Sequence, residues 1–336
     1  MPPRLRRSDL SKPGLTRRRS GKGWTFLDSD GSRITDPDTL ARIRALAIPP
    51  AYRDVWISPY RYGHVQAVGT DAAGRRQYRY HELWSQRRAQ AKHLKVLQVG
   101  ERLPTMRRRW ARDLRRDDLD RMRVLAAAAR LLDLGLFRIG GEEYAEEHST
   151  YGLATLRREH VKVRQGRLMF DYTAKHSLRR QEVVDDPAVL AVVDALRRRR
   201  DDPNPELFAY RTGGSWNDVK STTVNEYLRE VSGLEMSAKD FRTWHATVLM
   251  ASILAREPVP ATKRSRDRTV RSGYVEVSEA LGNTPAVCKT SYVDPRVVDL
   301  YHTGTVIAVP PTKRSDDAMR SALEKEVLDL LKVDPD

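Results

Sequence analysis

The spacing of hydrophobic and polar residues changes character near residue 82. From Trp24 to about Tyr80, short alternating stretches bounded by turn residues predict strands at 24–27, 32–35, 54–58, 64–70 and 75–81, with one helix at 38–46. Beyond Leu83 the apolar residues recur at helical spacing, which predicts helices at 84–100, 104–116, 118–134, 187–199, 221–232, 239–255, 274–281 and 316–332. The boundary between the two patterns is expected within residues 82–100.

A second group of strands interrupts the helical region. Residues 159–164 and 167–172 alternate on either side of Gln165-Gly166, and residues 178–184 follow after a turn that contains Lys175. The sequence therefore predicts an α+β protein: a small strand-rich N-terminal domain, and a larger, mainly α domain that carries a three-stranded antiparallel sheet. The predicted divisions are a basic flexible tail (1–22), the N-terminal domain (23–90) and the C-terminal domain (91–336).

The chain is strongly basic. Its 61 Lys and Arg residues against 45 Asp and Glu residues give a formal net charge of +16. A surplus of this size favours a polyanionic partner, most commonly nucleic acid, although a merely solvated basic surface is the alternative. Eight of these cations lie in residues 1–22, which predicts a disordered nucleic-acid-binding tail more than an organelle transit peptide. The cations of residues 258–273 predict a second basic loop, placed to close over a duplex.

Several classes of protein are disfavoured. The single cysteine, Cys288, cannot form an internal disulfide, and its most economical interpretation is a small core residue. No apolar run approaches the ~20 residues of a membrane span, so a cytoplasmic, nucleoid-associated protein is expected. The eight histidines lack metal-ligand spacing, and no glycine-rich loop precedes Lys-Ser/Thr, so neither a metal nor a nucleotide cofactor is expected.

The segment that ends at Tyr292 is the most informative for function. Gly282 predicts a helix stop, and Thr284 and Pro285 predict the start of a short new helix that ends before Asp294. Asn283 precedes Tyr292 by nine residues. A tyrosine in this position is ordinarily a packing residue, so the segment alone carries little weight.

Three basic residues upstream complete a set with a common chemistry. Arg138 follows a glycine break, Lys175 lies in a predicted turn, and Arg242 with His245 occupies one helix face behind a predicted capping box at 237–240. Arginine binds phosphate through two parallel donors, lysine can protonate a leaving oxygen, and a phenol can attack phosphorus. Each feature is common alone, but the set in a basic chain indicates transesterification at a DNA phosphate.

The order of these motifs resembles the type IB DNA topoisomerases, in particular their compact poxvirus-like and bacterial branch. The resemblance runs from about Trp24 to Tyr301 and includes FRIGGEEY, KDFRTWHAT, LGNTPAVCKTSY and, in the N-terminal region, GRRQYRYH. It implies relaxation of supercoiled DNA through a 3′-phosphotyrosyl intermediate, by a monomer that closes as a clamp around double-stranded DNA.

The resemblance also implies roles for individual residues. Tyr292 would attack the phosphate, Arg138 and Arg242 would bind its oxygens, and Lys175 would protonate the leaving 5′-oxygen. Asn283 stands where the viral members have histidine, so its role would be hydrogen bonding alone, and His245 would be a further phosphate contact. The residues that would contact DNA are Arg75, Arg76, Gln77, Tyr78, Tyr80 and Tyr144.

Two other functions remain in view at this stage. A tyrosine recombinase would use the same nucleophile and phosphate-binding residues, but its N-terminal domain is helical, whereas residues 24–80 predict strands. A non-catalytic basic DNA-binding protein would leave the set of Arg138, Lys175, Arg242 and Tyr292 as a coincidence. Tyr78 and Tyr80 could also simply pack between strands.

Overall fold

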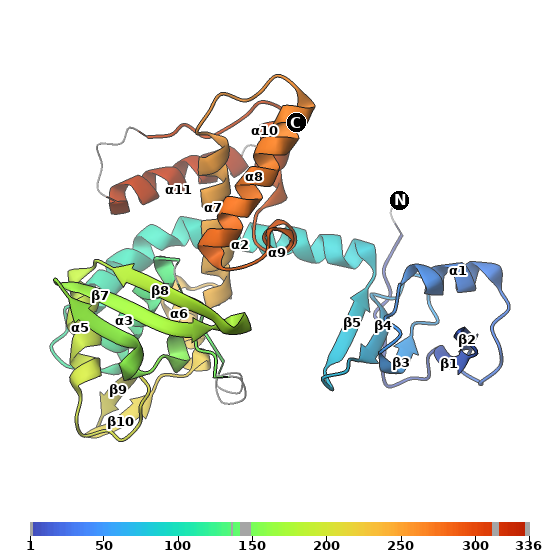
Figure 1. The fold of residues 1–336 in the computed structure, drawn as a ribbon, viewed down its shortest axis with the longest axis horizontal. Helices are drawn as coiled ribbons and strands as arrows, with labels where there is room; N and C mark the ends of the chain where they lie inside the picture. Colours follow the sequence, from blue (N-terminus) through green and yellow to red (C-terminus); the bar gives the residue numbers. More distant parts are fainter. Residues whose placement is uncertain (1–2, 136, 142–148, 311–315, 333–336) are drawn as a thin grey trace. The chain divides into compact units, whose positions relative to one another are not determined.

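The computed structural model describes residues 3–135, 137–141, 149–310 and 316–332. The chain forms two compact units, Met1–His93 and Leu94–Asp336, each described here by itself (Figure 1). Helix α2 (Glu82–Asp113) begins in the first unit and continues into the second. No helix in the described ranges is both long and apolar enough to span a membrane.

The first unit contains a three-stranded antiparallel sheet in the order β3-β4-β5 and a separate hairpin, β1-β2. Strand β4 is buried on both faces, with Val65, Ala67 and Val68 all inside, as expected for the central strand. A small core of Leu15, Ile43, Ile57 and Ala67 joins the helix to the sheet. The elements are β1 (Thr16–Ser20), β2 (Gly23–Leu27), α1 (Pro37–Ala45), β3 (Arg53–Ile57), β4 (Val65–Thr70) and β5 (Arg76–Tyr80).

The N-terminal segment differs from the expected flexible tail. Residues 16–20 pair with β2 as strand β1, and Leu15 exchanges two backbone hydrogen bonds of 2.8 Å with Ile57. Leu15 is buried, and the guanidinium of Arg17 donates to the carbonyls of Ile48 and Pro49 at 3.1 and 2.7 Å. One apolar anchor and one arginine with backbone acceptors therefore hold this segment to the unit. The predicted turn at 28–31 forms, and residues 32–35 return beside β2 through an antiparallel bridge between Leu27 and Arg33, while β1 pairs with β2 along its whole length.

The second unit is mainly helical and carries the three-stranded antiparallel sheet β6-β7-β8 (Figure 1). Val161 pairs with Phe170, and Leu168 pairs with Val184, which places apolar side chains on the covered face. Its strands and smaller hairpin are β6 (Val161–Arg164), β7 (Arg167–Ala174), β8 (Leu178–Val184), β9 (Ala209–Thr212) and β10 (Ser215–Asp218). Three short 3-10 helices cover Leu153–Thr155, Arg158–His160 and Lys175–Ser177.

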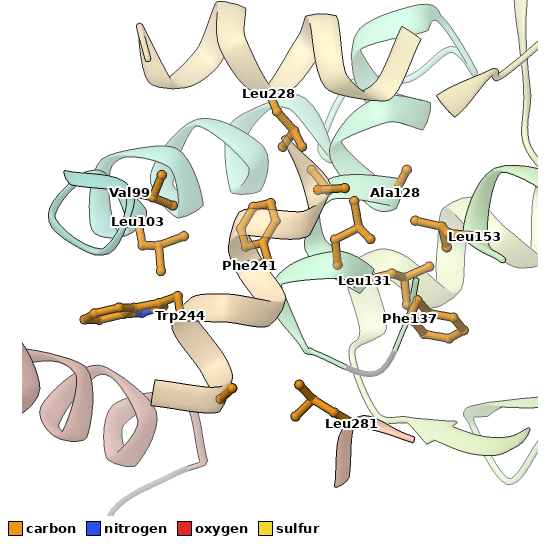
Figure 2. Close-up of a cluster of buried hydrophobic side chains, with 14 of the residues drawn as sticks. Val99, Leu103, Ala128, Leu131, Phe137, Leu153, Leu228, Phe241, Trp244 and Leu281 are labelled. Carbon is orange, nitrogen blue, oxygen red and sulfur yellow. The ribbon is translucent and has the colours of Figure 1, made fainter. Parts of the chain in front are cut away.

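The helices of the second unit pack around α7. Figure 2 shows Phe241 and Trp244 of α7 among aliphatic side chains of α2 and α3. A side-chain carbon at Gly100 of α2 would lie 2.7 Å from the Trp244 ring, so glycine permits the close approach of these two helices. The helices are α2 (Glu82–Asp113), α3 (Arg121–Asp133), α5 (Pro187–Arg198), α6 (Ser221–Ser232), α7 (Ala238–Leu254), α8 (Lys263–Leu281), α9 (Pro285–Ser291), α10 (Pro295–His302) and α11 (Asp316–Lys332).

Two helix predictions were wrong in their bounds. In place of the two predicted helices at 84–100 and 104–116, one continuous helix, α2, runs through Pro104 and ends at Asp113. Leu103 and Met106 on either side of this proline are buried in the core and hold the turn in place. The segment 258–273 is not a loop beyond residue 262. Thr262 caps α8 by accepting from the Ser265 amide at 3.2 Å, and Val270, Tyr274 and Val277 bury one face of that helix.

Candidate active site

Helix α7 positions Arg242 close to its N-terminus, as its fifth residue. The predicted capping box forms: the Ser237 amide donates to Asp240 Oδ2 at 2.8 Å, and Lys95 Nζ donates to the same oxygen at 2.9 Å. These bonds fix where α7 begins and therefore the direction of Arg242. Its side chain is buried, and Nη2 donates to the carbonyl of Leu281 at 2.5 Å.

Arg138 reaches the same end of α8 from a different element. Gly135 ends α3 with φ of 78°, a left-handed conformation that favours glycine, and lets the chain turn toward Arg138. Arg138 Nη2 donates to the Gly282 carbonyl at 2.6 Å and to Asn283 Oδ1 at 2.8 Å. Two guanidinium groups thus bind the last carbonyls of α8, where the helix dipole favours cations.

Tyr292 lies at the end of the next short helix. Thr284 accepts from the Val287 amide at 3.3 Å to start α9, and the Tyr292 amide donates to the Cys288 carbonyl at 3.1 Å. The Arg242 guanidinium carbon is 5.6 Å from the centroid of the Tyr292 ring, within the range of a cation–π contact. The predicted helix stop, helix start and terminal tyrosine are therefore all present.

A small open pocket collects three of the predicted residues. Arg138, Arg242 and Lys175 line it together with the end of α8, and Lys175 is exposed in the turn between β7 and β8. Asn283 and Tyr292 do not line the pocket themselves: Asn283 bonds to Arg138, and the Tyr292 ring lies beside Arg242. The remaining lining residues are Tyr151, Tyr172, Ala174, Leu178, Arg180, Leu281 and Gly282.

Sequence reasoning missed Arg180 and Tyr172. Tyr172 lies on β7 and Arg180 on β8 of the sheet β6-β7-β8. Alternation along β8 places Arg180 on one face with Leu178 and Glu182. Arg180 pairs with Glu182 at 2.6 Å. Burial raises the pKa of Tyr172 to about 12, so this phenol stays protonated at neutral pH. The missing information was tertiary: nothing local indicates that this face meets the end of α8.

The pocket is short of negative charge. Burial, together with the nearby charge of Arg138, lowers the pKa of Arg242, although it stays cationic. Burial and the charge of Arg180 lower the pKa of Arg138 in the same way, and the Tyr292 phenol acts in the opposite direction. Nε and Nη1 of Arg242 are buried without a hydrogen-bond acceptor among the described residues. Such a site is prepared for an anion with several acceptor oxygens.

His245 does not line this pocket. It occupies α7 one turn after Arg242, but its ring lies near Gly135, where an added side-chain carbon would be 3.2 Å away, and near the ring of Phe241. Burial lowers the pKa of His245 to about 4, which the Asp133 carboxylate only partly offsets. The imidazole is therefore neutral at physiological pH. Spacing on one helix was not enough to bring it beside Arg242.

The predicted N-terminal contacts lie on β5, except Arg75, which directly precedes it. Tyr78 and Tyr80 are 40% and 47% exposed, and their rings stack at 6.0 Å between centroids, so they do not pack into the core of the unit. Arg76 lies 6.0 Å from the Tyr78 ring. Gln77 Nε2 and Arg75 Nη2 instead bond to Asp71 in the preceding turn, at 2.9 and 3.1 Å.

Two predictions remain: a DNA contact by Tyr144, and a protein without a bound metal. Tyr144 lies outside the described residues. Within the part of the chain that the structure describes, no three His, Cys, Asp or Glu side chains gather as a metal site would require.

Comparison with known proteins identifies the family. Residues 82–302, about two thirds of the chain, match the family model described as eukaryotic DNA topoisomerase I, catalytic core. The chain belongs to this family, the type IB DNA topoisomerases. It is therefore a topoisomerase, an enzyme that relaxes DNA. Residues 23–71 match a second model, bacterial DNA topoisomerase IB, N-terminal domain.

Viral and fungal topoisomerases are among the similar proteins. DNA topoisomerase 1B of Acanthamoeba polyphaga mimivirus is 27% identical over 296 residues, which cover 86% of this chain and 87% of that protein. DNA topoisomerase I of Monkeypox virus is 22% identical over 69% of this chain and 71% of its own length. DNA topoisomerase 1 of Candidozyma auris is 27% identical over 64% of this chain but only 26% of its own length.

Proposed function

We propose that this topoisomerase relaxes supercoiled DNA by transient cleavage of one strand through Tyr292. The observation that carries the proposal is the pocket in which Arg138 and Arg242 converge, where two N–H-bearing nitrogens of Arg242 find no acceptor among the described residues and the Tyr292 ring lies beside Arg242. A phosphodiester would supply both the acceptors and the negative charge that these groups lack.

The proposed reaction is a balanced exchange of esters. Tyr292 Oη attacks phosphorus, a phosphotyrosyl bond forms to the 3′ side of the break, and the bond from phosphorus to the 5′-oxygen breaks. Lys175 gives its proton to that leaving oxygen, the phenol proton of Tyr292 passes to water, and water returns a proton to Lys175. Arg138 and Arg242 bind the two non-bridging oxygens. Asn283, which accepts from Arg138 at 2.8 Å, would keep that guanidinium in place or donate its own amide hydrogens to the phosphate.

The energetics support a reaction without ATP or an obligatory metal ion. One phosphodiester replaces another, so the exchange is close to isoenergetic and the stored ester bond can be reversed by the free 5′-hydroxyl. Torsional strain in the DNA gives the direction, because each turn lost at the open break lowers the free energy of the supercoil. Only one break is needed at a time, and a monomer is therefore sufficient.

We further infer that the first unit provides the second half of a clamp around the duplex. Exposed Tyr78 and Tyr80, with Arg76 beside them, form a surface of aromatic rings and cations suited to bases and phosphates. His245 would not contact the phosphate directly, because it lies outside the pocket, and its pKa of about 4 leaves the imidazole neutral at physiological pH. Association with the nucleoid would follow from the DNA substrate.

The test is relaxation of supercoiled plasmid in EDTA without nucleotide. Wild-type protein should relax the plasmid and form a covalent protein–DNA adduct, and Tyr292→Phe should do neither. Tyr301→Phe is the matched control, because it removes the same hydroxyl from a tyrosine that is fully buried. Equal relaxation by Tyr292→Phe would show that the nucleophile is another residue. Joining of two separate duplexes without relaxation would favour a recombinase-type strand transferase instead.

A further inference from the structure

Helix α8 has a solvent-facing row of arginines opposite its buried face. Val270, Tyr274 and Val277 pack toward the core, where α8 lies beside α7 (Figure 1). Arg264, Arg268 and Arg271 follow one another at intervals of four and three residues, which places them on one exposed face. We call these three residues the α8 arginine row.

The α8 arginine row contributes no ion pair or side-chain hydrogen bond to the part of the fold that the structure describes. None of the three side chains makes an ion pair or hydrogen bond with any residue in the described ranges, although other cations nearby do. Arg266 donates to the Pro260 carbonyl at 2.7 Å, and Arg256 pairs with Glu276 at 2.7 Å. Glu276 is thereby neutralised, and Asp267 lies 3.7 Å from His302. Exposed Glu279 comes two turns after Arg271 and marks the end of the row.

The position of these charges is unfavourable for the helix itself. The first turn of α8 contains Lys263, Arg264 and Arg266 and no acidic residue, although the dipole at a helix N-terminus favours acids. Arg264 and Arg268 also repel each other across one turn. An unfavourable arrangement of charges that no contact within the fold offsets is expected where a bound ligand offsets it.

The other end of the same helix reaches the candidate active site. Leu281 and Gly282 line the pocket and bind Arg242 and Arg138 through their carbonyls. With a rise of about 1.5 Å per residue, Arg271 lies roughly 15 Å and Arg264 roughly 26 Å along the helix axis from Leu281. For a duplex that runs along α8, with about 3.4 Å per phosphate along one strand, these distances correspond to about four to eight base pairs.

We propose that the α8 arginine row binds backbone phosphates of the duplex being cleaved, about four to eight base pairs to one side of the scissile phosphate. This proposal rests on the proposed function, because the pocket at the end of α8 defines the cleavage position. Continuity with that pocket is the reason for choosing the cleaved duplex over a second one. Phosphate contacts carry no sequence information, so the row should add affinity and direction without site preference.

The experiment compares wild type with the triple variant Arg264→Gln, Arg268→Gln, Arg271→Gln. The control is Arg200→Gln, Lys220→Gln, Arg229→Gln, which removes the same number of positive charges elsewhere. Arg229 lies on α6 and the other two residues precede this helix, which packs on α3 and α7. Binding is measured by fluorescence anisotropy at several salt concentrations, on one duplex with about twelve base pairs on both sides of a mapped cleavage site. Two further duplexes are each shortened to three base pairs on one side.

On the long duplex, the log–log salt slope of the triple variant should be less negative than that of wild type by about 2.7, for three lost phosphate contacts. The control should keep the wild-type slope. On the duplex that lacks the correct arm, wild type and triple variant should coincide. Cleavage at saturating protein should be unchanged, because the row does not touch the reacting atoms. Arg268→Gln alone should give about one third of the effect.

Two results would overturn the proposal. One is an unchanged slope for the triple variant on the long duplex. The other is a loss of binding that appears only when a second duplex is added, which would place the row on a crossing duplex. Failure of Tyr292 to form an adduct would instead refute the proposed function, and it would be seen in wild type irrespective of the slopes.

Discussion

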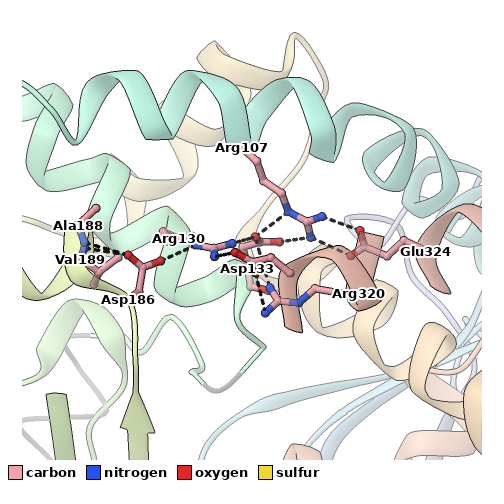
Figure 3. Close-up of polar contacts among 9 residues, drawn as sticks. Arg107, Arg130, Asp133, Asp186, Ala188, Val189, Arg320 and Glu324 are labelled. Atoms are coloured by element: carbon pink, nitrogen blue, oxygen red, sulfur yellow. Dashed lines mark hydrogen bonds and ion pairs between the residues drawn. The ribbon is translucent and has the colours of Figure 1, made fainter. Parts of the chain in front are cut away.

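Replacing Asp133 by alanine should destabilise the catalytic unit far more than replacing Asp317, although both carboxylates bond to the same arginine. Asp133 is fully buried at the end of α3 (Figure 3). It accepts from Arg107 Nε and Nη2 at 2.9 and 2.8 Å and from Arg130 Nη1 at 3.0 Å. Asp317 accepts from Arg130 Nη2 at 2.7 Å, but its side chain is 62% exposed.

The magnitude follows from burial. Removing one partner of a buried ion pair typically costs about 3–5 kcal/mol, because the remaining charge loses its compensation in a place that water does not reach. Arg107 retains Glu324 at 2.6 Å and Arg130 retains Asp186 at 2.9 Å, so we expect Asp133→Ala near the lower end, about 3 kcal/mol. The exposed Asp317→Ala should cost at most about 1 kcal/mol.

The assay is urea unfolding at pH 7 followed by tryptophan fluorescence. Hydrogen exchange of α3 peptides assigns the transition to the catalytic unit.

The pH dependence of the unfolding free energy gives a second check. Burial alone would raise the pKa of Asp133, but the bonds and charge of Arg107 outweigh it and hold the pKa below its usual 3.8. Its contribution is therefore complete above about pH 4 and is lost only as the pH falls through the lower folded value. Equal effects of the two substitutions at pH 7 would refute the reasoning.

Three further predictions concern the pocket and the core behind it. Lys175→Ala should cleave DNA poorly but recover on a substrate whose 5′-leaving oxygen is sulfur, whereas Lys162→Ala on the neighbouring strand should cleave normally; absence of rescue would contradict the acid role. Asn283→His should make the ratio of variant to wild-type cleavage rise as the pH falls through about 6.5, where imidazole gains a charge; a flat ratio between pH 5 and 7.5 would argue against contact with phosphate. Phe137→Ala should lower unfolding free energy by about 3–5 kcal/mol in denaturant titrations, because its buried ring packs edge-to-face on Phe170 at 4.9 Å; a cost below 1 kcal/mol would mean that the core collapses into the space.

Local patterns predicted most of the second unit. Helix α6 spans the predicted residues 221–232, and the sheet strands lie within two residues of their expected bounds, because apolar spacing and glycine turns decide both. Predictions failed where a local signal was outweighed by distant contacts. Pro104 does not end α2, since buried neighbours hold the helix, and the basic residues after Thr262 form a helix because its other face is buried.

The site could be predicted as a set of residues but not as a geometry. Arg138, Lys175 and Arg242 were identified through motif order, and they do line one pocket. The arrangement that joins them depends on the carbonyls at the end of α8, and backbone acceptors leave no trace in side-chain identity. For the same reason His245, which shares a helix with Arg242, turned out to lie beside Gly135 and not in the pocket.

The pocket also accounts for an amide at position 283. Burial lowers the pKa of both Arg138 and Arg242, the charge of Arg138 lowers that of Arg242 further, and the charge of Arg180 lowers that of Arg138. The free protein carries this cost until an anion binds. A protonated histidine bonded in the place of Asn283 would add a third cation to this group. The amide instead gives Arg138 an acceptor at 2.8 Å and adds no charge. Asn283 therefore reduces repulsion in the free pocket, and under the proposed mechanism the cost is one charge fewer to stabilise the phosphate during cleavage.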